Sequence, residues 1–186
     1  MAQLKILSLC GSLRKGSFNR MAMNLAMEVA PRDMVFEEAE MRTMPFFDGD
    51  EYAKGFPPPA AAFREKIRAA DGLFFACPEY NFSVSGVMKN AIDWASRAPD
   101  QPFANKPVTV ISATMGPLGG GRVQYELRRM LQSLLVFFMP KPETFIGVAQ
   151  NKFDAEGRCT DEMTRKFVTE HMAAFHDWIL RIRKLG

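Results

Sequence analysis

Three loops in this chain carry groups that bind small anions and flat rings, and each loop directly follows an apolar run. They span residues 11–20, 78–86 and 114–122. The first is rich in glycine and hydroxyl side chains, the second in aromatic rings, and the third in glycine, so backbone amides dominate it. In an open parallel α/β sheet, loops that follow strands meet at the carboxyl edge, where ligands bind. The sequence therefore predicts one ligand site built from all three loops.

The first loop departs from two common nucleotide-binding motifs. Gly11 and Gly16 are five residues apart, as in the phosphate loop of nucleoside triphosphatases. That motif needs Lys and then Ser or Thr directly after its second glycine. Here Ser17 and Phe18 follow Gly16, and the Gly-x-Gly-x-x-Gly dinucleotide pattern is absent. These differences argue against an ATPase and against a dinucleotide-binding fold of that type.

The first loop keeps the groups that hold a terminal phosphate monoester. Backbone amides at a helix N-terminus point outward and carry partial positive charge, which suits a dianion. The hydroxyls of Ser12 and Ser17 and the amide of Asn19 add hydrogen-bond donors. Arg14 can screen charge at the rim. The alternative is a plain strand–turn–helix connection in which Ser17 is only the helix N-cap.

The second loop combines aromatic rings with polar groups at the end of the central strand. Its aromatic and polar side chains are those of Glu79, Tyr80, Asn81 and Phe82. Such a loop suits a flat heterocycle, which needs hydrogen bonds at its edge and a wall to pack against. Alternatively, the aromatic rings only cover the edge of the sheet. Trp94, farther along, is expected in the core.

The third loop supplies small residues and many backbone amides beside the other two. Amides directed at the pyrimidine edge of a flavin would stabilise negative charge on the reduced ring. Because Gly119, Gly120 and Gly121 lead into a helix, the alternative is a flexible strand–helix turn. Together, a monophosphate cradle, a ring-binding loop and an amide-rich edge suggest a flavin mononucleotide (FMN) site and hence a redox enzyme.

No set of side chains around the loops forms a nucleophile or an acid–base pair. His171 and His176 lie far along the chain and are five residues apart, so they do not share one metal-binding helix face well. We expect them to pack or to lie on the helix surface, with no catalytic side chain and no metal site. Flavin chemistry fits this absence, because the cofactor itself carries out hydride transfer while the protein supplies orientation and electrostatics.

The composition is that of an ordinary globular protein. Of 186 residues, 47% are apolar and 24% charged, and the net charge of +3 is scattered along the chain. We predict a single domain over residues 1–186, no nucleic-acid partner and no membrane segment. Cys10, Cys77 and Cys159 form no Cys-x-x-Cys pair. Buried free thiols at Cys10 and Cys77 are expected, in a cytoplasmic protein.

Apolar runs alternate with helical periodicity along the chain, which is typical of a parallel α/β sheet. Strands are predicted at residues 4–10, 34–39, 72–77 and 108–113, and a last strand at 135–139 and 144–148, split by the Pro140-Lys-Pro142 bend. Helices are predicted from Ser17 to Pro31 and at 60–70, 86–97, 122–134 and 161–184. This alternation predicts a flavodoxin-like three-layer sandwich with a five-stranded parallel sheet in order 2-1-3-4-5.

The last helix shows end signals and a candidate buried face. Thr160 is its candidate N-cap, and acids fill its first turn and bases its last, as the helix dipole favours. The apolar residues expected to face the sheet are Phe167, Met172, Phe175 and Ile179.

Two long motifs resemble the signatures of the NADPH-dependent FMN reductase family, whose members include quinone, chromate and azo-dye reductases. They are residues 11–19, Gly-Ser-Leu-Arg-Lys-Gly-Ser-Phe-Asn, and residues 78–94. Segments 44–50 and 119–125 match as well, so the resemblance covers about residues 4–150. The family usually has proline before the glycine of the second motif. This chain has Ser85 there, which lifts the restriction that proline places on φ.

The resemblance implies which residues surround the cofactor. Around the FMN phosphate it places Ser12, Arg14, Ser17, Phe18 and Asn19. Along the isoalloxazine ring it places Pro78, Glu79, Tyr80 and Asn81, mainly through backbone contacts. It also implies a homodimer or homotetramer, with Tyr125 and Arg128 near a subunit interface.

The resulting hypothesis is an FMN-dependent NAD(P)H oxidoreductase that works by ping-pong exchange. NAD(P)H would deliver hydride to flavin N5 and leave, and a small-molecule acceptor (a quinone, an azo compound, chromate or free flavin) would take its place. We expect the acceptor near Tyr80, Phe82 and Arg122. The alternatives are a non-enzymatic, flavodoxin-like electron carrier and an FMN-binding regulatory module. The basic net charge disfavours the carrier, because such carriers tend to be acidic.

Overall fold

The computed structural model describes residues 3–185 and has a parallel sheet at its centre. Its strands lie in the order β2-β1-β3-β6-β7, and β8 also pairs with β6. Their bounds are β1 Leu4–Cys10, β2 Met34–Glu38, β3 Gly72–Ala76, β6 Pro107–Ala113, β7 Phe137–Phe138 and β8 Thr144–Ile146. With β7 and β8 as the two halves of the last strand, the predicted order 2-1-3-4-5 is confirmed.

The last strand is split in the way that the proline bend predicts. β7 pairs with the start of β6 through Pro107 and Val108, and β8 pairs with its end, from Ile111 to Ala113. The break between them removes one stretch of ladder but keeps both halves parallel to β6.

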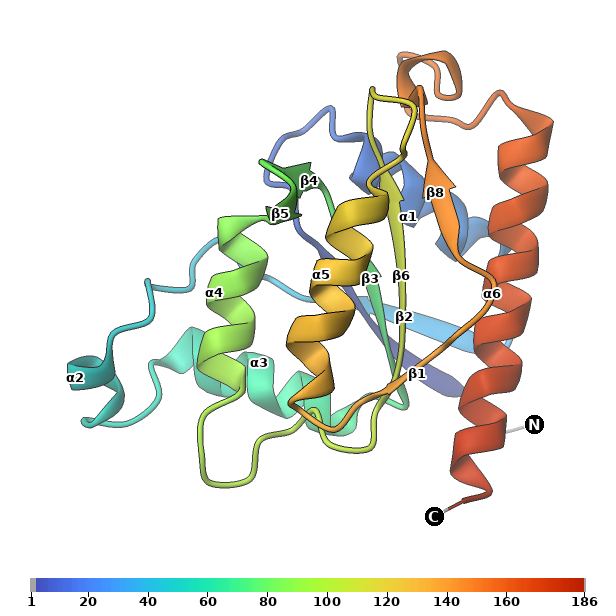
Figure 1. Ribbon diagram of the computed structural model, residues 1–186. Helices are drawn as coiled ribbons and strands as arrows, with labels where there is room; N and C mark the ends of the chain where they lie inside the picture. Colours follow the sequence, from blue (N-terminus) through green and yellow to red (C-terminus); the bar gives the residue numbers. More distant parts are fainter. Residues whose placement is uncertain (1–2, 186) are drawn as a thin grey trace.

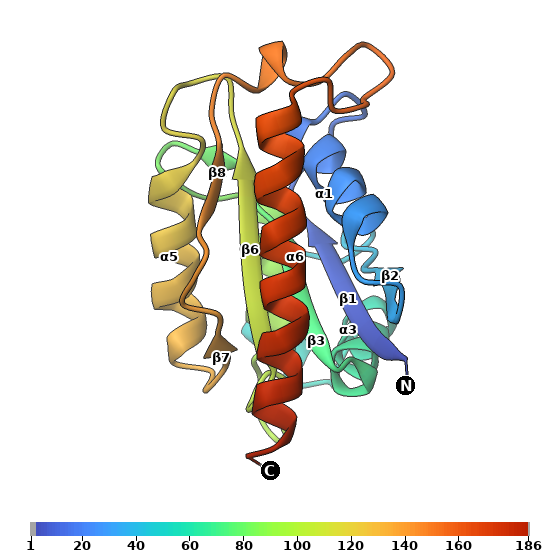
Figure 2. The same cartoon turned by 90° about the vertical axis from the view of Figure 1, so that its right-hand side faces the viewer.

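Helices cover both faces of the sheet and make three layers (Figure 1). α1 (Phe18–Val29) and α6 (Glu162–Arg183) lie on one face. α3 (Pro58–Ala69), α4 (Gly86–Ala95) and α5 (Gly121–Gln132) lie on the other, and the short α2 (Gly49–Tyr52) projects beyond them. Figure 2 looks onto α6, which crosses in front of the sheet, with the ends of the strands and their loops at the top.

The core is divided by the sheet into two apolar clusters. Phe74 and Phe75 are consecutive residues of β3, and because strand side chains alternate, Phe74 packs with α1 and α6 and Phe75 with α3 and α4. Trp94 is fully buried in the second cluster, as expected. This continuous burial on both faces explains why the strands read as unbroken apolar runs.

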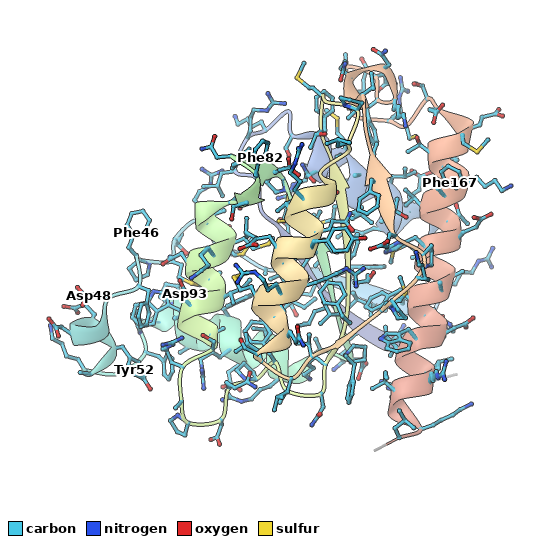
Figure 3. All side chains as sticks on the ribbon, viewed as in Figure 1. Phe46, Asp48, Tyr52, Phe82, Asp93 and Phe167 are labelled. Carbon is cyan, nitrogen blue, oxygen red and sulfur yellow. The ribbon has the colours of Figure 1, made fainter. Side chains whose placement is uncertain are left out.

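Two predictions about the last helix are wrong. Its N-cap is Asp161, whose carboxylate accepts a 2.7 Å hydrogen bond from the backbone N–H of Thr164. Phe167 is 51% exposed and lies in a surface groove beside β8 rather than in the core (Figure 3). Val168 is buried in its place, because it lies four residues before Met172 and so on the same helix face.

A small hairpin in the second loop was not expected from the sequence. β4 (Glu79–Tyr80) and β5 (Ser83–Val84) pair antiparallel, separate from the main sheet. A single 3-10 turn, η1 (Ala149–Asn151), follows β8. Within residues 3–185, no helix is both long enough and apolar enough to cross a membrane.

Candidate functional site

A cavity of about 310 Å³ lies where the three loops meet at the carboxyl edge of the sheet. It is lined by Ser12, Arg14, Ser17, Phe18, Asn19, Pro78, Glu79, Tyr80, Ala113, Thr114 and Met115. The cavity thus gathers eight of the nine residues predicted to bind the cofactor; only Asn81 is missing from its wall. Thr114 and Met115 were not predicted individually, although their place directly after β6 was the signal that could have found them.

Ser17 starts α1 beside this cavity. Its Oγ accepts a 3.3 Å hydrogen bond from the backbone N–H of Arg20, as the N-cap prediction required. A hydroxyl that accepts in this way still has its own hydrogen to donate. The helix N-terminus and the hydroxyl together therefore suit an anion.

Arg14 lies at the rim rather than inside the cavity. Its guanidinium donates a 2.5 Å hydrogen bond to the carbonyl of Gly16 and lies 5.9 Å from the centre of the Phe18 ring. Its side chain is exposed, which keeps its charge available at the mouth of the cavity.

Asn19 ties the first loop to the third. Its side chain is 3% exposed and pairs with both backbone groups of Ala113: Nδ2 donates to the carbonyl at 2.8 Å, and Oδ1 accepts from the N–H at 3.0 Å. One N–H and one lone pair of this amide, half of its hydrogen-bonding capacity, are therefore used to hold β6 against α1. Asn19 lines the cavity, but its main visible role is to position the two loops.

The hairpin of the second loop turns on Asn81 and Phe82. Both have positive φ, 50° and 65°, the conformation of a tight two-residue hairpin turn. Asn adopts it readily, but an aromatic residue there is unusual and costs about 1–3 kcal/mol. The turn holds the Phe82 ring in solvent, with 67% of its surface exposed (Figure 3).

Glu79 ties the second loop to the helix that follows the third. Its Oε2 accepts a 3.2 Å hydrogen bond from the backbone N–H of Val123, and its Oε1 lies 3.2 Å from Nη1 of Arg122. The residue in the cap position of α5 is Gly120, which has no side chain to offer. Glu79 therefore serves as the cap from outside, at the helix end where negative charge is favoured.

Arg122 also contacts the aromatic turn. Its guanidinium carbon lies 4.2 Å from the centre of the Phe82 ring, within the range of a cation–π contact. Across the cavity, Oγ of Ser12 and Oη of Tyr80 are 3.4 Å apart. The second loop is thus linked directly to the other two, and the first is also tied to the end of β6, where the third begins, so the three form one unit.

Glycine is required at three points of this unit. A Cβ on Gly11 would lie 2.8 Å from Cδ of Pro78 and 2.9 Å from Oγ of Ser85. Gly119 and Gly120 have φ of 59° and 83°, and a Cβ on either would come within 2.7 Å of a neighbour. Gly119 and Gly120 thus meet specific steric demands in the turn between β6 and α5.

The third loop is less rich in free amides than expected. The N–H groups of Gly119 and Gly121 donate to the carbonyls of Gly116 and Leu118, so the loop folds back on itself. Its contribution to the cavity wall comes from Thr114 and Met115.

Ser85 keeps the backbone geometry that proline would impose. Its φ is −60°, inside the range that a proline ring allows. Its hydroxyl is buried and has no hydrogen-bond partner among the described residues. The backbone at Ser85 therefore has the conformation of the family's proline without a proline ring to impose it.

The histidines do not belong to the site. His171 is buried between Thr109 and Thr144, with ring-nitrogen to hydroxyl distances of 2.8 Å and 2.9 Å. Burial, with a smaller effect from Arg128, lowers its pKa to about 4. His171 is thus neutral at ordinary pH and helps to hold β8 against β6. Residues 3–185 contain no cluster of His, Cys, Asp and Glu that could hold a metal ion.

Cys10 and Cys77 are buried free thiols, as expected. Burial raises the pKa of Cys77 to about 12, against a smaller lowering by the backbone of Ser85, and it raises that of Cys10 as well. Both thiols are therefore protonated and unreactive at ordinary pH.

Comparisons with known proteins agree with this site. The family model for NADPH-dependent FMN reductases matches residues 4–151, which include all three loops. The chain is 47% identical to an NAD(P)H-dependent FMN reductase of Pseudomonas aeruginosa, and the match covers 97% of each. It is 44% identical to a quinone reductase of Escherichia coli, over 97% of this chain and 98% of the relative.

A solved structure shares the fold over nearly its whole length. The flavoenzyme NAD(P)H:(acceptor) oxidoreductase FerB of Paracoccus denitrificans superimposes with a TM-score of 0.88 at 32% identity, covering 96% of this chain and 98% of that one. These likenesses extend over nearly the whole chain, so the resemblance seen in the two sequence motifs is confirmed. The chain is an oxidoreductase that belongs to the NADPH-dependent FMN reductase family.

Proposed function

We propose that this protein binds FMN in the cavity between the three loops, oxidises NAD(P)H there and passes the electrons to a small-molecule acceptor. The observation that carries the proposal is the cavity of about 310 Å³ lined by the first, second and third loops together. Family membership supports the same reading.

The residues present fit FMN. The N-terminus of α1, with the Ser17 hydroxyl beside it, offers donors and partial positive charge for the phosphate. Pro78 and Tyr80 offer a wall for the ring, and Arg14 adds charge at the rim. The cavity is near the lower end of the usual size for small-molecule sites. We place the second reactant on the face of the flat cofactor that the cavity does not enclose.

When bound, FMN supplies the redox chemistry, since its N5 accepts hydride from a nicotinamide and returns two electrons to an acceptor. The protein positions the reactants. Asn19 fixes the first loop against β6, and Glu79 fixes the second loop against α5. Rigid loops hold reacting groups in place, which accounts for much of an enzyme's advantage when no side chain takes part in the chemistry.

The acceptor binds beside the exposed aromatic residues of the second loop. Tyr80 and Phe82 are 51% and 67% exposed and offer flat apolar surfaces for a quinone or an azo compound. Arg122, stacked on Phe82, can contact the oxygen atoms of a quinone or chromate. NAD(P)H and the acceptor use the same open face in turn, which makes the mechanism ping-pong.

We further propose a homodimer or homotetramer in the cytoplasm, without nucleic-acid or membrane partners. Tyr125 is exposed and donates a 3.3 Å hydrogen bond to Glu143. Arg128 lies 3.8 Å from the same carboxylate. We place the interface at this polar group, where the exposed Tyr125 of α5 meets the 140–143 segment.

Steady-state kinetics tests the mechanism. Initial rates measured at several fixed quinone concentrations while NADPH varies should give parallel double-reciprocal lines. Lines that intersect would mean that both reactants bind at once and would overturn the ping-pong order. A purified protein that is colourless and takes up no added FMN would contradict the cofactor assignment itself.

A further inference from the structure

A second cavity, of about 250 Å³, lies on the other side of the first loop. It is lined by Cys10, Ser12, Leu13, Arg14, Lys15, Arg20, Glu38, Ala39, Glu40, Met41 and Arg42. Ser12 and Arg14 belong to the walls of both cavities, so only the first loop separates them. Its volume is below the usual range for a complete small-molecule site, so it suits one end of a longer ligand.

Positive charge dominates this second cavity. Four of its lining residues are basic and two are acidic. Arg20 and Glu38 form an ion pair with each other. No ion pair of the described residues includes Arg14, Lys15 or Arg42. Three uncompensated cations thus face a single remaining carboxylate, that of Glu40.

Arg42 is held in place by groups of the same cavity. Its Nη2 donates a 2.8 Å hydrogen bond to the carbonyl of Leu13, and its backbone N–H donates to the Glu40 carboxylate at 2.6 Å. The first bond fixes one side of the guanidinium and leaves its other N–H groups available. The second bond shows that the Glu40 carboxylate already accepts a hydrogen bond from the backbone.

The chemistry of these groups matches a phosphate monoester. Guanidinium groups bind phosphate in a bidentate way, and a lysine adds a point charge. An acidic residue beside an adenosine ribose selects a free 2′-hydroxyl, whereas an arginine there accommodates a 2′-phosphate. Of the two acids here, Glu38 at the end of β2 is paired with Arg20, and Glu40 accepts from the Arg42 backbone, so the Arg42 guanidinium is the group left to meet a ligand.

We propose that the second cavity binds the adenosine 2′-phosphate of NADPH, with Arg42 and Lys15 as the residues that favour NADPH over NADH. The inference rests on the proposed function, because the nicotinamide end of the same molecule must reach the first cavity. The shared wall of Ser12 and Arg14 makes the two cavities neighbours, as a dinucleotide bound across the first loop requires.

The test compares Arg42→Ala and Lys15→Ala with the wild type, all loaded with FMN. Each variant should lower kcat/KM for NADPH about tenfold, the effect of one lost charge-assisted hydrogen bond, and should change kcat/KM for NADH less than twofold. Lys184→Ala removes the same charge from the far end of α6 and should change neither. An unchanged ratio of NADPH to NADH efficiency in both cavity variants would overturn the proposal.

A binding measurement separates this inference from the proposed function. By calorimetry, adenosine 2′,5′-bisphosphate should bind the wild type, bind both variants about tenfold more weakly, and bind better than adenosine 5′-monophosphate. If inorganic phosphate displaces the bisphosphate when both are at the same concentration, the cavity is a simple anion site and the inference is contradicted. If neither nucleotide reduces the flavin while the bisphosphate still binds through Arg42 and Lys15, the proposed function fails and the subsite stands.

Discussion

The carboxylate of Glu79 accepts a 3.2 Å hydrogen bond from the backbone N–H of Val123, so the second loop caps the helix that follows the third loop. The cap position of that helix is a glycine in a left-handed conformation, which cannot cap with a side chain. One carboxylate therefore stabilises α5 and fixes the wall on which the flavin ring is proposed to lie.

Replacing Glu79 should affect stability and cofactor binding together. Glu79→Ala removes the cap and the ion pair with Arg122, and should lower the free energy of unfolding by about 0.5–2 kcal/mol. FMN affinity should fall as well, because the second loop loses its connection to α5. Glu79→Gln keeps a hydrogen-bond acceptor for Val123 and should recover most of both losses. Urea unfolding and FMN titration measure the two effects; equal losses in both variants would show that the charge, not the cap, matters.

The triple glycine offers a matched comparison within one loop. Gly119→Ala and Gly120→Ala place a Cβ at positive φ and within 2.7 Å of a neighbour, so each should destabilise the fold by about 1–3 kcal/mol. A Cβ on Gly121 meets nothing within 4 Å, and its φ is ordinary. Gly121→Ala should therefore be neutral or slightly stabilising. Thermal unfolding of the three variants checks this, and similar midpoints for all three would contradict the steric account.

Most of the fold could be predicted because its signals are local. The strands are apolar runs, and the helices are marked by residues such as Ser17, which caps α1 as expected. Even the split of the last strand followed from the Pro140–Pro142 bend. Phe167 was misassigned because an apolar residue one position from the buried face looks like part of it until its neighbours are known.

The sequence predicts which residues belong to the site, but not how those residues contact one another. Motifs and strand order place Ser12, Ser17 and Pro78 at one edge of the sheet. They do not show that Asn19 pairs with Ala113, a residue 94 positions away, or that Glu79 caps α5. Such pairs depend on distances between loops, which sequence spacing does not contain. The β4–β5 hairpin was missed because a turn with positive φ at Phe82 breaks the usual residue preference.

Ser17 should distinguish FMN from riboflavin, which lacks the phosphate. Ser17→Ala removes a hydroxyl donor and the N-cap of α1, and should weaken FMN binding about tenfold while changing riboflavin affinity much less. Ser133→Ala, at the end of α5 and away from the cavity, is the control and should change neither affinity. Fluorescence titrations of both flavins give the ratio. An equal loss for FMN and riboflavin would place the phosphate elsewhere.

His176 should make stability depend on pH. Partial burial opposes its charged form, but hydrogen bonds with Asp33 and Asp177 outweigh this and raise its pKa above 6.5. The hydrogen bond with His176 also lowers the pKa of Asp33 below 3.8, so the carboxylate stays charged across this range. A raised folded pKa means that the stabilisation is fully present below pH 6.5 and disappears as pH rises through the folded value.

The variant His176→Gln should therefore be less stable than the wild type at about pH 5.5 and closer to it at about pH 8.5. Urea unfolding at both pH values measures the difference. His171→Gln serves as a comparison of opposite sign. In the folded protein His171 has a pKa of about 4 and stays neutral at both pH values, whereas the unfolded imidazole is protonated below about pH 6.5. The destabilisation by His171→Gln should therefore be smaller at about pH 5.5 than at about pH 8.5. A loss of stability in His176→Gln that is larger at about pH 8.5 than at about pH 5.5 would contradict this account.

The most direct test of the central claim is the colour of the FMN-loaded protein when a nicotinamide nucleotide is added without oxygen. Site and family together predict that one equivalent of NADPH or NADH removes the visible flavin absorbance, and that a quinone added next restores it. A flavin that stays oxidised with both nucleotides would contradict the claim that this cavity is the active site of a reductase.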